Sequence, residues 1–211
     1  MSSFDASALL QVVNVVKTFP GVRALDEVCF DVRTGEIHAL VGENGAGKST
    51  LMHVLAGVHR PEQGKILFEG REARFQSPTD AARMGVAVVF QELSLSENLS
   101  VAENVFTNRQ PVGAFGLVDG RRLHAETAAW IRTAGLSVDP RTLVSRLSAS
   151  ERQVVEILKA VAQNPRVLIL DEPTSSLTAS DARTLFENIR RWQREGMSFV
   201  YVTHRLSEVF E

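Results

Sequence analysis

The stretch from Ala39 to Thr50, ALVGENGAGKST, holds the residues of this sequence best suited to phosphate chemistry. Gly42 to Ser49 match the pattern G-x-x-x-x-G-K-[ST], between an apolar run and an expected helix. Glycines let backbone N–H groups curl around phosphate oxygens, and the helix that follows points its positive end at them. A lysine at the place of Lys48 reaches the β and γ phosphates. The stretch therefore predicts a loop that binds a nucleoside triphosphate.

Each residue of this loop has an expected task. Lys48 is expected to neutralise charge on the phosphates, and the Ser49 hydroxyl to be one ligand of Mg²⁺. The residues expected to contact the nucleotide are Gly42, Asn44, Gly45, Gly47, Lys48, Ser49 and Thr50. A glycine-rich turn without a ligand is the alternative, and the strand and helix patterns on either side favour the phosphate loop over it.

A second candidate group follows the apolar run Val167–Leu170. The run predicts a buried strand that presents Asp171 and Glu172 at the carboxyl edge of a sheet, where open α/β sheets bind ligands. There Asp171 can hold Mg²⁺, and Glu172 can orient or deprotonate an attacking water. The alternative is a pair of surface carboxylates. The sequence contains no Asn-Lys-x-Asp segment, which argues against a GTPase.

Strands and helices alternate around these groups. Apolar runs predict strands through most of the first 90 residues, with one helix over residues 47–57. Helical spacing dominates residues 92–163, and a strand, a helix and a strand follow up to residue 204. This alternation predicts an α/β fold with a mainly parallel sheet. We expect a core of residues 1–91 and 164–211, and a helical insertion over 92–163.

Composition places the chain among ordinary soluble globular proteins. It has 211 residues, of which 44% are apolar, and a formal net charge of −2, so no polybasic surface for nucleic acid or lipid is indicated. No signal peptide is recognisable, and no segment approaches the ~20 apolar residues that span a bilayer. A membrane role would therefore need a partner. The single cysteine, Cys29, lies in an alternating pattern and is expected to be a small buried side chain of a strand.

Taken in order along the chain, these motifs and several others resemble the ATP-binding-cassette (ABC) ATPases. FPGVRAL is similar to their adenine-stacking loop, with Phe19 as the aromatic residue, and VFQ to their glutamine loop, with Gln91 near Mg²⁺. LSASERQ resembles their signature segment, SSLT the loop after the acidic strand, and VTHR the switch histidine, His204. The resemblance implies a P-loop NTPase fold of ABC type, with an N-terminal antiparallel β region and a helical signature subdomain over 92–163.

Within that superfamily, the segments around the phosphate loop and the signature look most like the sugar-import ATPases of the ribose, galactose and xylose type. Chains of that type carry two cassettes in tandem, so the resemblance implies a first cassette without its C-terminal end and without the second cassette. It also implies transmembrane permease subunits and, indirectly, a periplasmic sugar-binding protein as partners. The expected location is the cytoplasmic face of the plasma membrane, and no nucleic-acid partner is expected.

The signature departs from the usual L-S-G-G-Q, whose glycines let a helix N-terminus approach the γ-phosphate held by a partner cassette. This chain keeps Leu147 and Ser148 but continues with Ala149, Ser150 and Glu151. The added Cβ atoms and the carboxylate should weaken that approach, because like charges repel. We therefore expect an asymmetric pair of sites, of which the site completed by Ser148 is the weaker. A plain N-capping serine is the alternative.

Two other functions stay open. A soluble ABC-type ATPase acting on ribosomes or DNA would be expected to bring coiled-coil heptads, a basic arm or a charged insertion, and this sequence has none. A nucleotide-binding regulatory module should have lost the equivalents of Glu172 and His204, and both are present. The favoured interpretation is the ATPase subunit of a sugar importer, with ATP as substrate, Mg²⁺ as cofactor and Glu172, His204 and Lys48 as catalytic residues.

Overall fold

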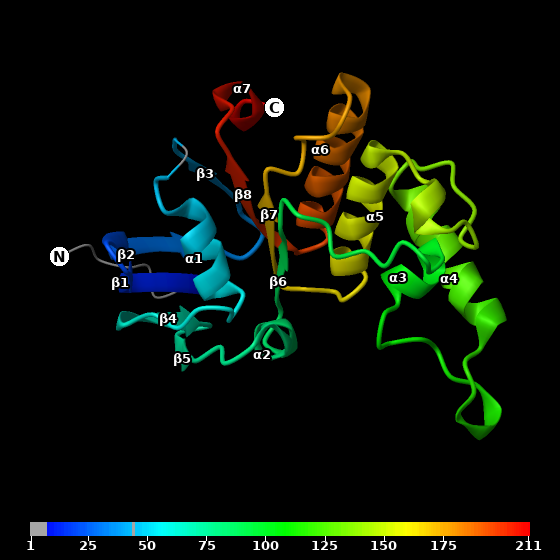
Figure 1. The fold of residues 1–211 in the computed structure, drawn as a ribbon, viewed down its shortest axis with the longest axis horizontal. Coiled ribbons are helices and arrows are strands. Elements are labelled where there is room, and N and C mark those ends of the chain that lie inside the picture. Colours follow the sequence, from blue (N-terminus) through cyan, green and yellow to red (C-terminus); the bar gives the residue numbers. More distant parts are fainter. Residues whose placement is uncertain (1–7, 44) are drawn as a thin grey trace. The chain divides into compact units, whose positions relative to one another are not determined.

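The chain forms two compact units in a computed structural model that describes residues 8–43 and 45–211 (Figure 1). Among the described residues, the first unit comprises those up to Val88, together with Pro165–Glu172 and Arg191–Glu211, and the second comprises Val89–Asn164 and Pro173–Arg190. Each unit is therefore assembled from segments that lie far apart in the sequence.

An antiparallel sheet forms one part of the first unit. Its strands are ordered β2-β1-β4-β5, with bounds β1 (Leu10–Phe19), β2 (Val22–Val32), β4 (Gln63–Phe68) and β5 (Arg71–Ala73). β1 packs into the core, where Leu10, Val12 and Val15 are fully buried. The neighbouring Gln11 and Val16 are buried as well, so both faces of β1 are covered over part of its length.

The expected burial of Cys29 is wrong, although the residue does lie in a strand. Its side chain is exposed. The register between β1 and β2 shifts between Val12 and Val15, and Asn14 between them has a φ of 48°. The Asn14 N–H donates to Cys29 Sγ at 3.1 Å, and the thiol donates to Asn14 Oδ1 at 2.9 Å. The irregularity gives the thiol polar partners at the surface, which an alternating pattern does not reveal.

A second sheet of the first unit carries the acidic strand. Its order is β3-β8-β7-β6, with bounds β3 (Ile37–Val41), β6 (Val86–Val89), β7 (Val167–Asp171) and β8 (Ser198–Thr203). β8 pairs in parallel with both β3 and β7. All residues of β7 and β8 are buried, as expected for parallel strands covered on both faces. The predicted α/β fold with a parallel core and an N-terminal antiparallel sheet is confirmed.

Short helices complete the first unit: α1 (Lys48–Leu55), α2 (Pro78–Arg83) and α7 (Leu206–Val209). α1 begins directly after the glycine-rich loop and buries Leu51, Met52, Val54 and Leu55. It contacts β2, and Figure 1 shows it beside the β1–β2 hairpin. Burial of this apolar face holds α1 in place, and with it the helix N-terminus at Lys48.

The second unit is helical. It contains α3 (Val101–Val105), α4 (Gly120–Thr133), α5 (Ala149–Val161), the short turns η1 (Ala114–Gly116) and η2 (Val144–Arg146), and most of α6 (Ala179–Arg194). α3 packs against α4 and α5, and Val155, Ile157 and Leu158 of α5 are fully buried. Among the described helices, none has the length and apolar character needed to cross a bilayer.

Candidate functional site

The phosphate loop joins β3 to α1 through left-handed glycines. Gly45 and Gly47 have φ values of 85° and 87°, a region that residues with a Cβ rarely adopt. A Cβ on Gly47 would also lie 2.3 Å from the carbonyl oxygen of Ala24 on β2. No side chain caps the N-terminus of α1, so the N–H groups of its first turn stay available for an anion. Asn44, which was also predicted to contact nucleotide, lies outside the described residues.

Lys48 lies at the mouth of this loop. Its Nζ donates to the carbonyl oxygen of Gly42 at 2.6 Å and to that of Glu43 at 2.8 Å. The next residues of the first turn are Ser49, which is exposed, and Thr50, which is half-buried. The ammonium, the open helix end and the Ser49 hydroxyl therefore come together in one turn of chain.

Asp171, the last residue of β7, is buried, with only 7% of its surface exposed. Burial raises the pKa of its carboxyl group and the charge of Glu172 raises it further, whereas the nearby positive charges of Lys48 and His53 lower it. No hydrogen bond to this carboxylate is found among the described residues. A buried carboxylate without a donor is better stabilised by a cation than left alone.

Asp171 and Ser49 suit the way in which proteins usually bind Mg²⁺ together with a nucleotide. Across the described part of the chain, no group of three or more His, Cys, Asp or Glu side chains could form a cage for a metal ion. Mg²⁺ commonly takes one or two protein oxygens and completes its shell with phosphates and water. The Asp171 carboxylate and the Ser49 hydroxyl are such oxygens.

Glu172 and His204 are brought together although 32 positions separate them in the sequence. Glu172 Oε1 lies 2.8 Å from His204 Nδ1. Glu172 has a φ of 46°, and its N–H donates to Val202 O of β8 at 3.0 Å. A left-handed residue other than glycine costs roughly 1–2 kcal/mol. The tertiary contacts therefore hold Glu172 in a conformation that it would not adopt by itself.

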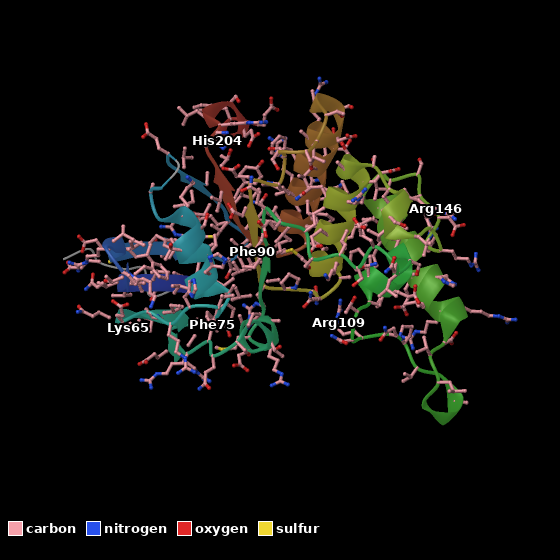
Figure 2. The ribbon with its side chains drawn as sticks, viewed as in Figure 1. Lys65, Phe75, Phe90, Arg109, Arg146 and His204 are labelled. Carbon is pink, nitrogen blue, oxygen red and sulfur yellow. The ribbon has the colours of Figure 1, made fainter. Side chains whose placement is uncertain are left out.

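The chain around His204 is fastened by residues that the sequence did not single out. Thr203 Oγ1 donates to Glu208 Oε2 at 2.7 Å and accepts from the Arg205 N–H at 2.9 Å. Tyr201 donates to the same Glu208 oxygen at 3.1 Å. Figure 2 shows His204 beyond the end of β8, next to α7. No sequence pattern indicates this support, because it depends on how α7 folds back.

Phe19, the predicted adenine-stacking residue, ends β1 and is half-buried. It belongs to the β1–β2 hairpin, whose Ala24 and Leu25 lie against the position of Gly47. Its ring centroid lies 5.3 Å from that of His59. Phe19, the phosphate loop, Asp171, Glu172 and His204 thus all belong to the first unit.

A cavity of about 370 Å³ opens elsewhere in the first unit, beside the C-terminal part of α1. Its lining includes Val54, Lys65 and Phe75, of which the last two are labelled in Figure 2. None of the predicted site residues lines it. The chemistry described above therefore belongs to the loop and the sheet edge, and not to this cavity.

The remaining predicted residues belong to the second unit. Gln91 is exposed and follows the end of β6.

The signature segment forms the N-terminus of α5. Ser148 caps this helix: its Oγ accepts from the Glu151 N–H at 3.2 Å, while Glu151 Oε2 accepts from the Ser148 N–H at 2.8 Å. Ser150 Oγ donates to Ser176 O at 3.1 Å, and Ala149 begins the helix. The N-capping alternative thus describes the geometry of this segment, with a carboxylate folded over the helix end.

The chain is similar to known proteins over nearly its full length. A family model described as "ABC transporter" matches residues 25–175. A putative ribose/galactose/methyl galactoside import ATP-binding protein of Burkholderia cenocepacia is 48% identical over 206 residues, covering 98% of this chain and 39% of that protein. A ribose import ATP-binding protein, RbsA 1, of Streptomyces avermitilis is 45% identical and covers 97% of this chain and 39% of its own length. The chain thus spans about two fifths of the length of these relatives.

Solved structures show the same fold. A nucleotide-free ATP-binding cassette from an ABC transporter superposes with a TM-score of 0.84 at 24% identity, covering 96% of this chain and 84% of that one. Another ATP-binding cassette of an ABC transporter gives a TM-score of 0.85 at 25% identity, with coverage of 97% and 84%.

Proposed function

This chain belongs to the ABC transporter family, and on that premise we propose that it binds and hydrolyses ATP with Mg²⁺ to power the import of a sugar through a membrane permease. One observation carries the proposal: the 2.8 Å contact between Glu172 and His204, next to the buried Asp171. A module that only binds nucleotide needs the phosphate loop alone. A hydrolase also needs a positioned base, and this contact supports Glu172 as that base.

The proposed nucleotide site uses the first unit. Backbone N–H groups of the loop and of the first turn of α1 bind phosphate oxygens, and Lys48 leaves its two carbonyl partners to contact the β and γ phosphates. Phe19 stacks on the adenine. Bound Mg²⁺, held by Ser49 and Asp171, would neutralise the phosphate charge that builds up during the reaction.

Glu172 is proposed as the base of the hydrolytic step. It orients a water in line with the γ-phosphorus and takes its proton as the water oxygen bonds to phosphorus. The bond from phosphorus to the β–γ bridging oxygen breaks, and that oxygen leaves with ADP. His204 fixes the Glu172 carboxylate through Nδ1 and adds a hydrogen-bonding group at the same edge.

The second unit supplies the proposed contacts beyond this site. Gln91 is proposed to approach Mg²⁺, and residues 92–163 to form the helical signature subdomain inserted into a core of 1–91 and 164–211. The helix end at Ser148 would face the γ-phosphate of another cassette. Because Glu151 already bonds to that end, we expect the site completed by this chain to be the slower of an asymmetric pair.

The names of the relatives support the proposed partners and location. Those relatives are named import ATP-binding proteins for ribose and related sugars. We propose that this chain likewise works with transmembrane permease subunits, a second cassette and, indirectly, a periplasmic sugar-binding protein, at the cytoplasmic face of the membrane.

Glu172→Gln tests the proposal in the protein expressed from its complete gene and reconstituted with its permease in lipid vesicles. Both ATP hydrolysis and sugar uptake are expected to fall by about two orders of magnitude or more, since the base is lost, while Mg-ATP still binds. The matched control is Glu195→Gln, because Glu195 is exposed on the same unit.

Other outcomes separate the alternatives. Hydrolysis without any permease-dependent uptake would favour a soluble ATPase. Binding of Mg-ATP with no turnover in the unmodified protein would favour a regulatory module. Unchanged hydrolysis in Glu172→Gln would remove Glu172 from the reaction.

A further inference from the structure

Phe19 is the first of a row of aromatic rings in the first unit. Its ring lies nearly perpendicular to that of His59, with centroids 5.3 Å apart and planes at 70°. The His59 ring lies in turn 5.2 Å from that of His53, with planes at 59°. Ring pairs in such tilted arrangements attract each other beyond simple burial. The orientation of Phe19 is therefore coupled to a residue that neither the motifs nor the fold had marked.

The turn that follows α1 places His59 in this row. α1 ends at Leu55, and Gly57 turns the chain with a φ of 73°. A Cβ on Gly57 would lie 2.6 Å from Ser77 O, so only glycine fits there. The N–H groups of Val58 and His59 both donate to His53 O, at 2.9 and 3.1 Å. His59 is thus held by backbone contacts as well as by its ring.

The same connection is fastened to β1 on the other side of His59. Glu62 Oε1 accepts from Lys17 Nζ and from the Thr18 N–H, each at 3.2 Å. The pKa of Glu62 is lowered, chiefly by the Thr18 backbone hydrogen bond. Lys17 Nζ also lies 5.4 Å from the Phe19 ring centroid. The segment that carries His59 and the strand end that carries Phe19 therefore form one connected element.

We propose that His59 is a positioning residue that orients Phe19 for stacking on the nucleobase. The inference rests on the proposed role of Phe19 at the adenine. Through His53, a residue of α1, the row connects the base-stacking ring to the helix that begins at Lys48. Phe19 would contact the base and the N-terminus of α1 the phosphates, with His59 and His53 packed between them. A change at His59 should therefore weaken binding of the base alone.

The test compares a ligand that has a base with one that lacks it. In the protein expressed from its complete gene, His59→Ala is expected to weaken Mg-ATP binding by about 2- to 10-fold, the range of a lost ring pair. Binding of Mg-tripolyphosphate, measured by calorimetry, should stay unchanged, because it uses only the loop. His59→Phe should restore ATP affinity, since a ring remains. Val58→Ala, at an exposed neighbour, is the control and should change neither ligand.

Each result decides between a role at the base and a role in the fold. Equal weakening of both ligands in His59→Ala would overturn the proposal, because the residue would then support the loop as a whole. Unchanged ATP binding in His59→Ala would overturn it as well. Phe19→Ala reports on the premise: if that variant keeps the full preference for ATP over tripolyphosphate, the proposed role of Phe19 fails, whatever His59 does.

Discussion

Two helix N-termini in this protein have the same backbone physics and opposite local chemistry. α1 begins after Gly47 without any side-chain cap, and its neighbour at the loop is the Lys48 ammonium. α5 begins after Ser148 with a complete capping box, in which the Glu151 carboxylate accepts from the Ser148 N–H. The first end is open to an anion, while the second already holds a negative group of its own.

The difference shows what a helix end needs before it can serve as a phosphate site. The partial positive charge exists at both ends, because both present unpaired N–H groups in the first turn. At α5 a capping box satisfies two of the donors and adds a carboxylate. At α1 glycines keep side chains away and lysine adds positive charge. We therefore expect α1 to bind phosphate strongly and α5 weakly.

Removing the charge at the open end should have the largest effect. Lys48→Met is expected to lower ATP hydrolysis by about 10²–10³-fold, because a cation aimed at the transferred phosphate is lost. The measurement is phosphate release by the full-length protein. Lys65→Met, at an exposed lysine of the same unit, is the control. Retention of most activity in Lys48→Met would contradict the open-end interpretation.

The second largest effect is expected from a side chain added at the N-terminus of α1, which should lower the stability of the protein. Gly47→Ala is expected to lower the free energy of unfolding by about 3 kcal/mol, because the Cβ would lie 2.3 Å from Ala24 O in a left-handed turn. Gly45→Ala is the matched control: its φ is similar, at 85°, but the position has nothing within 4 Å, so roughly 1 kcal/mol is expected. Equal losses in urea denaturation would show that the contact with β2 does not matter.

Removing the cap at the N-terminus of α5 should have a smaller effect. Ser148→Ala is expected to cost about 1 kcal/mol of stability, the usual loss for an N-cap. Ser100→Ala is the comparison, because Ser100 and Glu103 form the same capping box at α3, and it should cost at least as much since Ser100 is buried. In turnover assays of the protein expressed from its complete gene, Ser148→Arg should lose less activity than Glu172→Gln. Equal losses would remove the proposed asymmetry.

The smallest expected effect has the opposite sign. The folded protein raises the pKa of Asp171 above its ordinary value of 3.8, so the native state binds more protons than the unfolded state between the two values. Stability from this group is present at low pH and falls as the pH rises through that range. Asp171→Asn should therefore slightly raise the denaturation midpoint at pH 7 without Mg²⁺, while it weakens Mg-ATP binding.

Two controls test this prediction. The gain in stability should vanish near pH 3, where Asp171 is protonated in both states. Asp26→Asn, at an exposed aspartate of the same unit, should show no such gain. A loss of stability in Asp171→Asn at pH 7 would mean that the carboxylate makes favourable contacts in the folded protein.

Sequence patterns predicted the segments whose structure depends mainly on their own residues, such as the buried strand and the glycine loop. The run Val167–Leu170 forms a fully buried strand, because a parallel strand covered on both faces favours a continuous apolar run. The loop before Lys48 was predictable from glycine spacing, since glycine tolerates the required backbone angles. By contrast, the burial of Cys29 was predicted wrongly, because its partner Asn14 lies on another strand at an irregularity of the register.

Sequence patterns were enough to predict the elements and the reactive groups: a glycine loop with Lys48, a buried strand ending in Asp171 and Glu172, and an α/β order of segments. Which of these groups lie next to one another depends on how the chain folds. It brought Glu172 within 2.8 Å of His204 and placed His59 against Phe19. Both contacts join residues distant in the chain, and their geometry follows from strand register and packing, which no local propensity encodes. The capping box of Ser148 and Glu151, by contrast, is local, because its residues are three positions apart.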